Sequence, residues 1–167
     1  CIQRLVDLKS IKLKLNNSAN IFEAIKSCRN LGTVEIDFSY SDITESNIIE
    51  SLSSLGNIKQ LEKLVLNLSG CSQLSPKTMS LLSDYLSSMK NLRCLNLMME
   101  DCSCLDDTSF ANFTPGFMRL SKLGALHLNF SQSKLSDKTF MPLFYSLREF
   151  QHLHTINFIL RNCNLGN

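Results

Sequence analysis

The sequence has few glycines, a small net charge and no long apolar run, and each of these shortages excludes a class of function. Six glycines are scattered through 167 residues, and they form no glycine-rich loop that could hold a phosphate group. The net charge is only +2, whereas nucleic-acid binders usually have a larger and more clustered basic excess. No run of 18 apolar residues and no signal-peptide pattern is present, so no membrane association is predicted.

Cysteines are present, but their number does not fit a disulfide framework. There are seven, an odd count, whereas secreted disulfide scaffolds usually have an even number at characteristic spacings. Cys102 and Cys104 lack the second Cys or His pair that zinc sites show. We therefore expect reduced thiols, no bound metal, no cofactor and a cytoplasmic, intracellular location.

One phrase, Leu-x-x-Leu-x-Leu-x-Leu in its general form, returns six times along a chain that is 44% hydrophobic and 19% charged. The last five residues of each phrase alternate between apolar and other side chains, which is the pattern of a strand with one buried face. Successive copies begin 23, 30, 31, 31 and 30 residues apart, at Leu8, Leu31, Leu61, Leu92, Leu123 and Leu153. This regularity predicts a solenoid, in which stacked repeats bury a shared core.

The long repeats contain a second element, a predicted helix. Four good N-cap residues each lie 17 residues before the next leading leucine, namely Thr44, Ser75, Asp106 and Ser136. Apolar residues then recur at helical spacing, for example Phe140, Phe144, Leu147 and Phe150 in the last helix. Pro115 and Pro142 predict that two helices are kinked or split. The shorter first repeat predicts only a brief helix near residues 21–26.

A serine or cysteine lies ten residues after each leading leucine, and an aliphatic residue follows shortly after it. This column consists of Ser18, Ser41, Cys71, Cys102, Ser133 and Cys163. The whole pattern, over about residues 5–167, resembles the leucine-rich repeat superfamily, nearest its ribonuclease-inhibitor-like branch with repeats of about 30 residues. The column stands where the family phrase usually has Asn or Cys. The resemblance implies an α/β horseshoe solenoid with a parallel β-sheet on its concave face and helices on its convex face.

The chain, residues 1–167, is expected to form a single leucine-rich repeat solenoid segment of about five and a half repeats. Solenoids need polar capping units at their ends for solubility. No such unit is evident at either end of this sequence. We therefore expect a segment of a longer chain, or ends that a partner covers.

The strand residues that do not face the core are expected to point into the concave groove. Neighbouring strands should place Lys12 opposite Glu35 and Lys14 opposite Asp37, so charge cancels locally and a phosphate-binding groove is disfavoured. A third column, which includes Ser69 and Ser131, is expected to face the groove as well. The residues expected to bind a partner are Glu35, Asp37, Val65, Asn67, Asn96, Met98, Glu100, His127, Asn129, Asn157, Ile159 and Arg161.

Mixed polar and apolar side chains in such a groove suit a protein surface. No recognisable catalytic motif places a nucleophile or a carboxylate near His127, His152 or His154, so an enzyme is not expected. The resemblance implies protein–protein recognition, and we expect a non-catalytic interaction scaffold with protein partners, without nucleic acid or membrane. Two alternatives stay open: a regulatory arm of a larger signalling enzyme such as a kinase, and an architectural subunit of a large assembly. A further alternative is a solvated groove without a partner.

Overall fold

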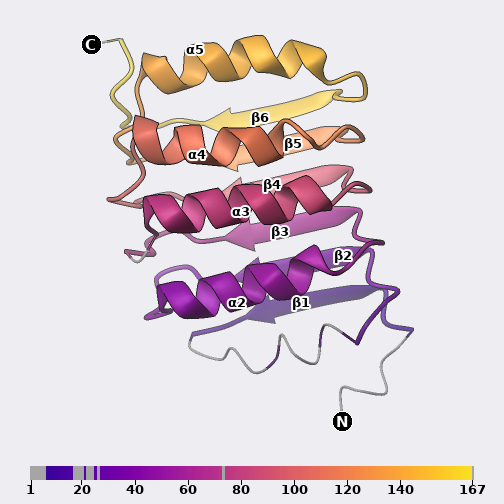
Figure 1. Ribbon diagram of the computed structural model, residues 1–167. Helices are drawn as coiled ribbons and strands as arrows, with labels where there is room; N and C mark the ends of the chain where they lie inside the picture. Colours follow the sequence, from indigo (N-terminus) through magenta and orange to yellow (C-terminus); the bar gives the residue numbers. More distant parts are fainter. Residues whose placement is uncertain (1–6, 17–20, 22–24, 26, 73, 167) are drawn as a thin grey trace.

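The computed structural model describes residues 7–16, 21, 25, 27–72 and 74–166, and within them strands and helices alternate (Figure 1). The strands are β1 (Ser10–Lys14), β2 (Thr33–Asp37), β3 (Lys63–Asn67), β4 (Cys94–Met98), β5 (Ala125–Asn129) and β6 (Thr155–Ile159). The helices are α2 (Glu45–Gly56), α3 (Pro76–Ser88), α4 (Asp107–Phe117) and α5 (Asp137–Ser146), followed by the 3₁₀ turn η2 (Leu147–Glu149).

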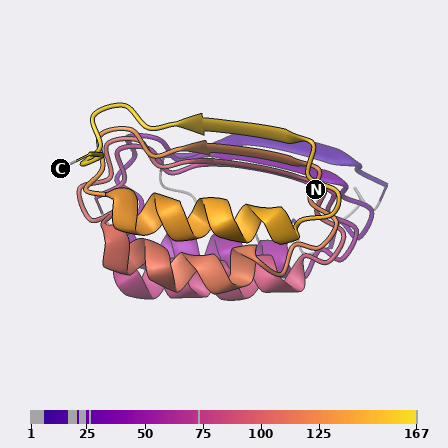
Figure 2. The ribbon, with the colours of Figure 1, turned by 90° about the horizontal axis from the view of Figure 1, so that it is seen from above.

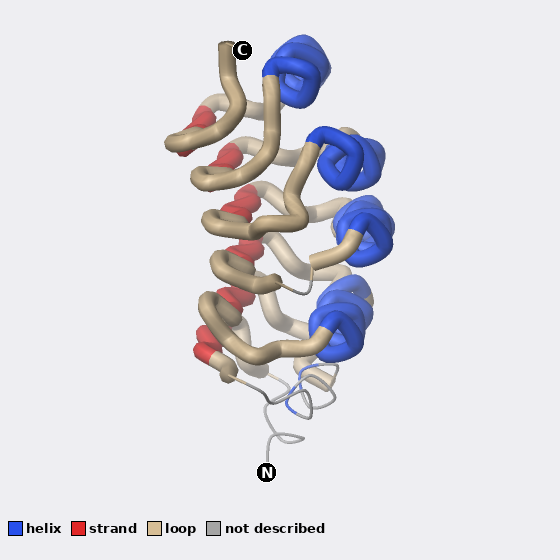
Figure 3. The backbone as a smooth tube through the Cα atoms, turned by 90° about the vertical axis from the view of Figure 1, so that its left-hand side faces the viewer, coloured by secondary structure: helices blue, strands red, loops and turns tan. Residues whose placement is uncertain are grey.

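The strands form one six-stranded parallel sheet in the order of the sequence, β1 to β6. All the described helices lie on one face of this sheet, and the other face is left uncovered (Figures 2 and 3). Each strand pairs with the next in the same repeat register, so that Leu64 lies beside Leu95 and Leu95 beside Leu126. The predicted α/β solenoid and its register are thereby confirmed, whereas the horseshoe curvature stays a prediction.

The core lies between the sheet and the helices. Inward strand residues such as Leu95 and Leu126 are fully buried, and they meet helix residues such as Leu52, Leu86 and Phe113, which are also fully buried. Each such side chain contributes about 1.5–3 kcal/mol relative to an exposed one. The spacing of apolar residues along strand and helix therefore determines which face of each element turns inward.

The four predicted N-cap residues are confirmed. Thr44, Ser75, Asp106 and Ser136 each accept a hydrogen bond from a backbone N–H in the first turn of the following helix.

The expected effect of the internal prolines differs between the two helices. Helix α4 continues through Pro115 as one helix, whereas α5 ends four residues after Pro142 and is followed by η2. Most of the brief helix expected near residues 21–26 lies outside the described residues.

The Ser/Cys column closes the turn that follows each strand. The thiols of Cys71, Cys102 and Cys163 donate to strand-end carbonyls of the preceding repeat, at 3.4, 3.2 and 3.2 Å. Burial raises the pKa of Cys71 to about 11 and that of Cys102 to about 12. Thiols that stay protonated at neutral pH are poor nucleophiles and poor metal ligands, which fits a structural role.

Two expectations about burial are wrong. Ser131 is only 2% exposed and Ser69 is also buried, so these two members of the third column do not face the groove. Phe144, expected in the core, is 46% exposed and packs edge-on against Phe158 with 5.4 Å between the ring centroids. Phe144 is exposed because no described element packs on the outer side of α5 and β6.

Substituting Leu97 tests the strand register. Leu97→Asp would place an unpaired charge between sheet and helices, and we expect it to lower the free energy of unfolding by more than about 3 kcal/mol. Asn96→Asp, one residue away on the uncovered face, should change stability by less than about 1 kcal/mol. Thermal and denaturant unfolding measure both. Equal stability of the two variants would show that the register is wrong.

Candidate functional site

The candidate site is the uncovered face of the sheet, where two columns of side chains cross the strands. In each column, strand pairing places a residue beside the residue at the same position of the next strand, as the repeat register predicts. The first column is Lys12, Glu35, Val65, Asn96, His127 and Asn157, and the second is Lys14, Asp37, Asn67, Met98, Asn129 and Ile159. All of these side chains are half-buried or exposed, so they are open to a partner.

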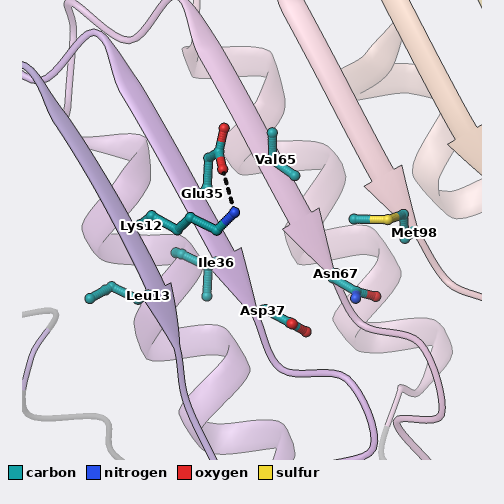
Figure 4. A pocket seen from close by; sticks show the side chains of 8 residues that line it. All are labelled: Lys12, Leu13, Glu35, Ile36, Asp37, Val65, Asn67 and Met98. Carbon is teal, nitrogen blue, oxygen red and sulfur yellow. Dashed lines mark ion pairs between the residues drawn. The ribbon is translucent and has the colours of Figure 1, made fainter.

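One end of this face holds paired charges. The expected pairs are confirmed. Lys12 Nζ lies 3.4 Å from Glu35 Oε2 (Figure 4), and Lys14 Nζ lies 3.8 Å from Asp37 Oδ2. Lys63 also reaches Glu35, with 2.8 Å between Nζ and Oε1. The hydrogen bond from Lys63, aided by Lys12, holds the pKa of Glu35 below its usual value despite the opposing effect of burial.

Sequence reasoning missed Lys63. This residue lies two positions before Val65 on β3, and strand alternation places both side chains on the same face. Alternation therefore gave a signal for a further column on the face, at the first residue of each strand. The repeat phrase does not include this column, because its regular alternation begins one residue later.

The polar residues at the strand ends also hold the following turns. The side-chain oxygens of Asp37, Asn67 and Asn129 accept the backbone N–H two residues further on, at 2.9, 3.1 and 3.1 Å. Burial raises the pKa of Asp37, but the N–H of Ser39 and the charge of Lys14 outweigh it, and the net pKa is lowered. These three residues therefore have a structural role independent of any partner.

Strands β4 and β6 end in Met98 and Ile159, which cannot accept such a hydrogen bond. Here the N–H of the residue two positions on, Glu100 or Arg161, donates to a serine hydroxyl of the preceding repeat. Ser69 Oγ serves Glu100 and Ser131 Oγ serves Arg161, both at 3.2 Å. This is why the two serines turn inward instead of facing the groove. The repeats thus close the same turn in two different ways.

Two small hollows lie on the face, on either side of Met98. One, of about 110 Å³, lies between Met98 and the paired charges and includes Val65 and Asn67 in its lining (Figure 4). The other, of about 150 Å³, includes His127 and Ile159 in its lining. Both are smaller than the roughly 300–1,000 Å³ of ordinary small-molecule sites. Each is of a size that suits one protruding side chain of a protein.

Polar side chains also lie where β4, β5 and β6 end. The Glu100 carboxylate accepts from Asn129 Nδ2 at 3.0 Å and from Gln132 Nε2 at 3.2 Å, so two amides fix its position. Asn157 and Arg161 are exposed on and just after β6. The structure therefore brings the expected residues of the strands together on one surface, with Glu100 held beside it in the turn after β4.

An exposed aromatic residue, Tyr40, was also missed. It has a positive φ in the turn after β2, at the position that Gly70, Asp101 and Gln132 occupy in later repeats. Its side chain is 69% exposed, and its ring lies against Gly70, where an added Cβ would come within 2.3 Å of the ring. Exposed tyrosines are frequent anchors in protein interfaces. A bulky residue in a turn position that favours glycine was the available signal.

The described residues lack the features of a metal site and of a membrane-spanning helix. They contain no group of three or more His, Cys, Asp or Glu side chains placed to hold a metal ion. The helices in this part of the chain are too short or too polar to cross a membrane. His127 lies in the middle of the sheet face, whereas His152 and His154 line a separate hollow where the strands begin. The three histidines therefore do not form one cluster.

Comparison with known proteins supports the fold. No family model matches the chain, and no curated protein matches it either. Among solved structures, actin-binding site 2 of leiomodin-1 matches with a TM-score of 0.61 and 15% identity, over 83% of this chain and 77% of that one. An internalin C2 from Listeria monocytogenes str. 4b F2365 matches with a TM-score of 0.37 and 15% identity, over 98% and 83%. At such identity the leiomodin likeness shows the fold alone.

The ion pair of Glu35 gives a test of this geometry. In Lys63→Met we expect the pKa of Glu35 to rise toward its ordinary value of 4.5, because the largest stabilising contact of the carboxylate is lost. A lowered carboxyl pKa adds stability that is present above the unfolded value and is lost as pH falls through the folded value. The variant should therefore lose less stability than the parent between neutral pH and about pH 3.

NMR titration of the Glu35 side chain measures this pKa directly. Lys14→Met is the matched control, because Lys14 pairs with Asp37 and leaves the two cations at Glu35 in place. An unchanged Glu35 pKa in Lys63→Met, or an equal rise in Lys14→Met, would contradict the geometry described above.

Proposed function

We propose that this chain is a non-catalytic protein–protein interaction scaffold that binds a partner through the uncovered, concave face of its sheet. The observation that supports it most is the pair of small hollows on either side of Met98, on a rigid sheet with mixed polar and apolar side chains. Such a mixture is typical of protein interfaces. A thioether side chain between two hollows adapts its shape to a partner at little cost.

The middle of the face is the proposed centre of the contact. Val65, Asn96, Met98 and His127 lie there on three neighbouring strands, β3 to β5, next to the paired acids of β2. Because parallel strands hold these side chains in place, less conformational entropy is lost when a partner binds. Asp37, Asn67 and Asn129 are proposed to contact the partner while they hold the turns.

The finer family and cellular assignments are proposals as well. We infer the ribonuclease-inhibitor-like branch of the leucine-rich repeat superfamily, because helices of 10–13 residues return along the convex side. We also infer a single solenoid segment of a longer chain, and an intracellular location from the reduced thiols. The leiomodin-1 structure is an actin-binding site, which supports protein binding as a use of this fold and identifies no partner here.

A second candidate function is that of an architectural subunit. It is favoured by apolar side chains exposed on the outer side of β6 and α5, where Ile156 is 49% exposed and Phe144 and Tyr145 are exposed too. Exposed apolar clusters of this kind mark interaction sites or aggregation liabilities. The two candidates differ in the surface that the partner contacts, so one experiment separates them.

The proposed test uses the double variant Val65→Arg/Met98→Arg. Both side chains are half-buried on the sheet face and neither holds a turn, so the protein should fold. A partner is first identified by affinity capture and cross-linking from the source cell, and its affinity is then measured with purified proteins. Two long, charged side chains would fill the hollows and need desolvation, so we expect binding to weaken by about tenfold or more.

Ser80→Arg/Thr108→Arg is the matched control, because it adds the same charge at exposed helix positions away from the sheet face. The control should bind as the parent does. Normal binding by the folded sheet variant, with cross-links confined to Lys77, Lys90 or Lys138, would move the contact away from the sheet face and favour the architectural role.

A further inference from the structure

Basic side chains gather at one edge of the stack. We call the loops that lead into the strands, residues 27–33, 57–63, 88–94, 118–125 and 148–155, the starting edge. Their backbones stack directly, since the N–H groups of Glu62, Arg93, Gly124 and His154 each donate to the preceding repeat at 2.7–2.9 Å. The starting edge holds two acids, Glu62 and Glu149, against Arg29, Lys59, Lys63, Lys90, Arg93, Arg119, Lys122 and Arg148.

Two acids of the opposite edge, where the helices begin, are explained by the fold. Glu45, in the first turn of α2, accepts the hydroxyls of Ser75 and Thr78 at the start of α3. Asp107, in the first turn of α4, accepts the N–H and hydroxyl of Ser136 at 2.8 and 2.6 Å. These carboxylates hold one helix start to the next, and they also lie where the helix dipole favours negative charge. No partner is needed to account for them.

Several cations of the starting edge have no such explanation. The last turns of α2, α3, α4 and α5 contain no basic residue, and the dipole effect of a helix end falls off beyond the last turn. Lys63 pairs with Glu35, and Lys122 donates to Asn91 Oδ1 at 2.7 Å. Within the described part of the chain, no ion pair joins Arg29, Lys59 or Arg93 to an acid, although all three are exposed.

Two hollows follow the same edge. One, of about 460 Å³, is lined by Arg93, Lys122, Gly124, Ala125, His152 and His154. The other, of about 380 Å³, is lined by Cys28, Arg29, Asn57, Ile58, Lys59 and Gln60. Neither lining includes an acid. In the first, the His154 ring lies over Gly124, where an added Cβ would be 2.9 Å from Nε2, so glycine leaves room for the imidazole.

We propose that the starting edge binds an acidic segment of a partner protein, whose carboxylates lie along the two hollows. Arg93 and Lys122 come from neighbouring repeats, so they meet successive acidic side chains of one extended segment, and Arg29 and Lys59 continue the row. Charge-assisted contacts between guanidinium and carboxylate groups are strong and directional. This surface differs from the sheet face, so neither proposal depends on the other.

An acidic polypeptide fits this edge better than a nucleic acid does. The only rings in the linings of the two hollows are imidazoles, whereas sequence-tolerant binding of single strands relies on larger aromatic side chains for base stacking. The net charge of the chain is only +2, and the opposite edge is acidic, so a long polyanion that wraps the solenoid would meet repulsion. A short acidic segment contacts the basic edge alone.

The test measures binding of a fluorescent octaglutamate peptide by anisotropy at 50 mM salt, with an octaglutamine peptide as the neutral probe. We expect the parent protein to bind octaglutamate and not octaglutamine, with weaker binding at 200 mM salt. Arg93→Glu/Lys122→Glu should weaken octaglutamate binding by about tenfold or more, because two attractive contacts become repulsive. Both side chains are exposed, so the fold should persist, and far-UV circular dichroism checks it.

Lys77→Glu/Lys138→Glu is the matched control, since it makes the same change of charge in the first turns of α3 and α5 on the opposite edge. It should bind octaglutamate as the parent does. Equal weakening in both double variants would show that octaglutamate binding depends only on net charge, and this would overturn the proposal. A 12-nucleotide single strand that binds more tightly than octaglutamate, and is lost in Arg93→Glu/Lys122→Glu, would overturn it in favour of nucleic acid.

Discussion

Stacking is the constraint on which the rest of this structure depends, because a single repeat has too little surface to bury its own apolar residues. Leu95 on β4 is fully buried, because helices and neighbouring strands enclose it on all sides. Ile156, the equivalent residue on β6, is 49% exposed, although its sequence pattern is the same. Burial is thus a property of neighbouring repeats taken together, as expected for a quasi-one-dimensional fold.

Within the stack, the helices are not equally close. Helices α3 and α4 approach so closely that the N–H of Gly116 donates to Ser83 Oγ at 2.7 Å, and a Cβ on Gly116 would lie 1.7 Å from the Ser83 carbonyl oxygen. Between α4 and α5 the surface opens into a hollow of about 330 Å³ with Pro115 and Pro142 in its lining. A glycine after a proline therefore serves close packing on one side of α4, while prolines line the wider gap on the other.

The surface side chains contribute to the fold to different degrees on the sheet face, at the helix starts and at the starting edge. On the sheet face, Asp37 and Asn129 hold turns, whereas Val65 and Met98 lie on the same face and hold none. At the helix starts, acidic side chains accept hydrogen bonds from the next repeat. At the starting edge, Arg29, Lys59 and Arg93 form no ion pair within the described residues, which is why that edge is proposed to meet an acidic partner.

The sequence by itself determined the strands, their register, the four helix caps and the two columns of the sheet face. These follow from side-chain periodicity and cap chemistry, which act over a few residues and repeat along the chain. The tertiary structure decided what depends on stacked neighbours: the inward turn of Ser69 and Ser131, the contact of Lys63 with Glu35, and the basic edge. Its cations lie in loops about 30 residues apart, so no local pattern reveals them, and only stacking brings them side by side.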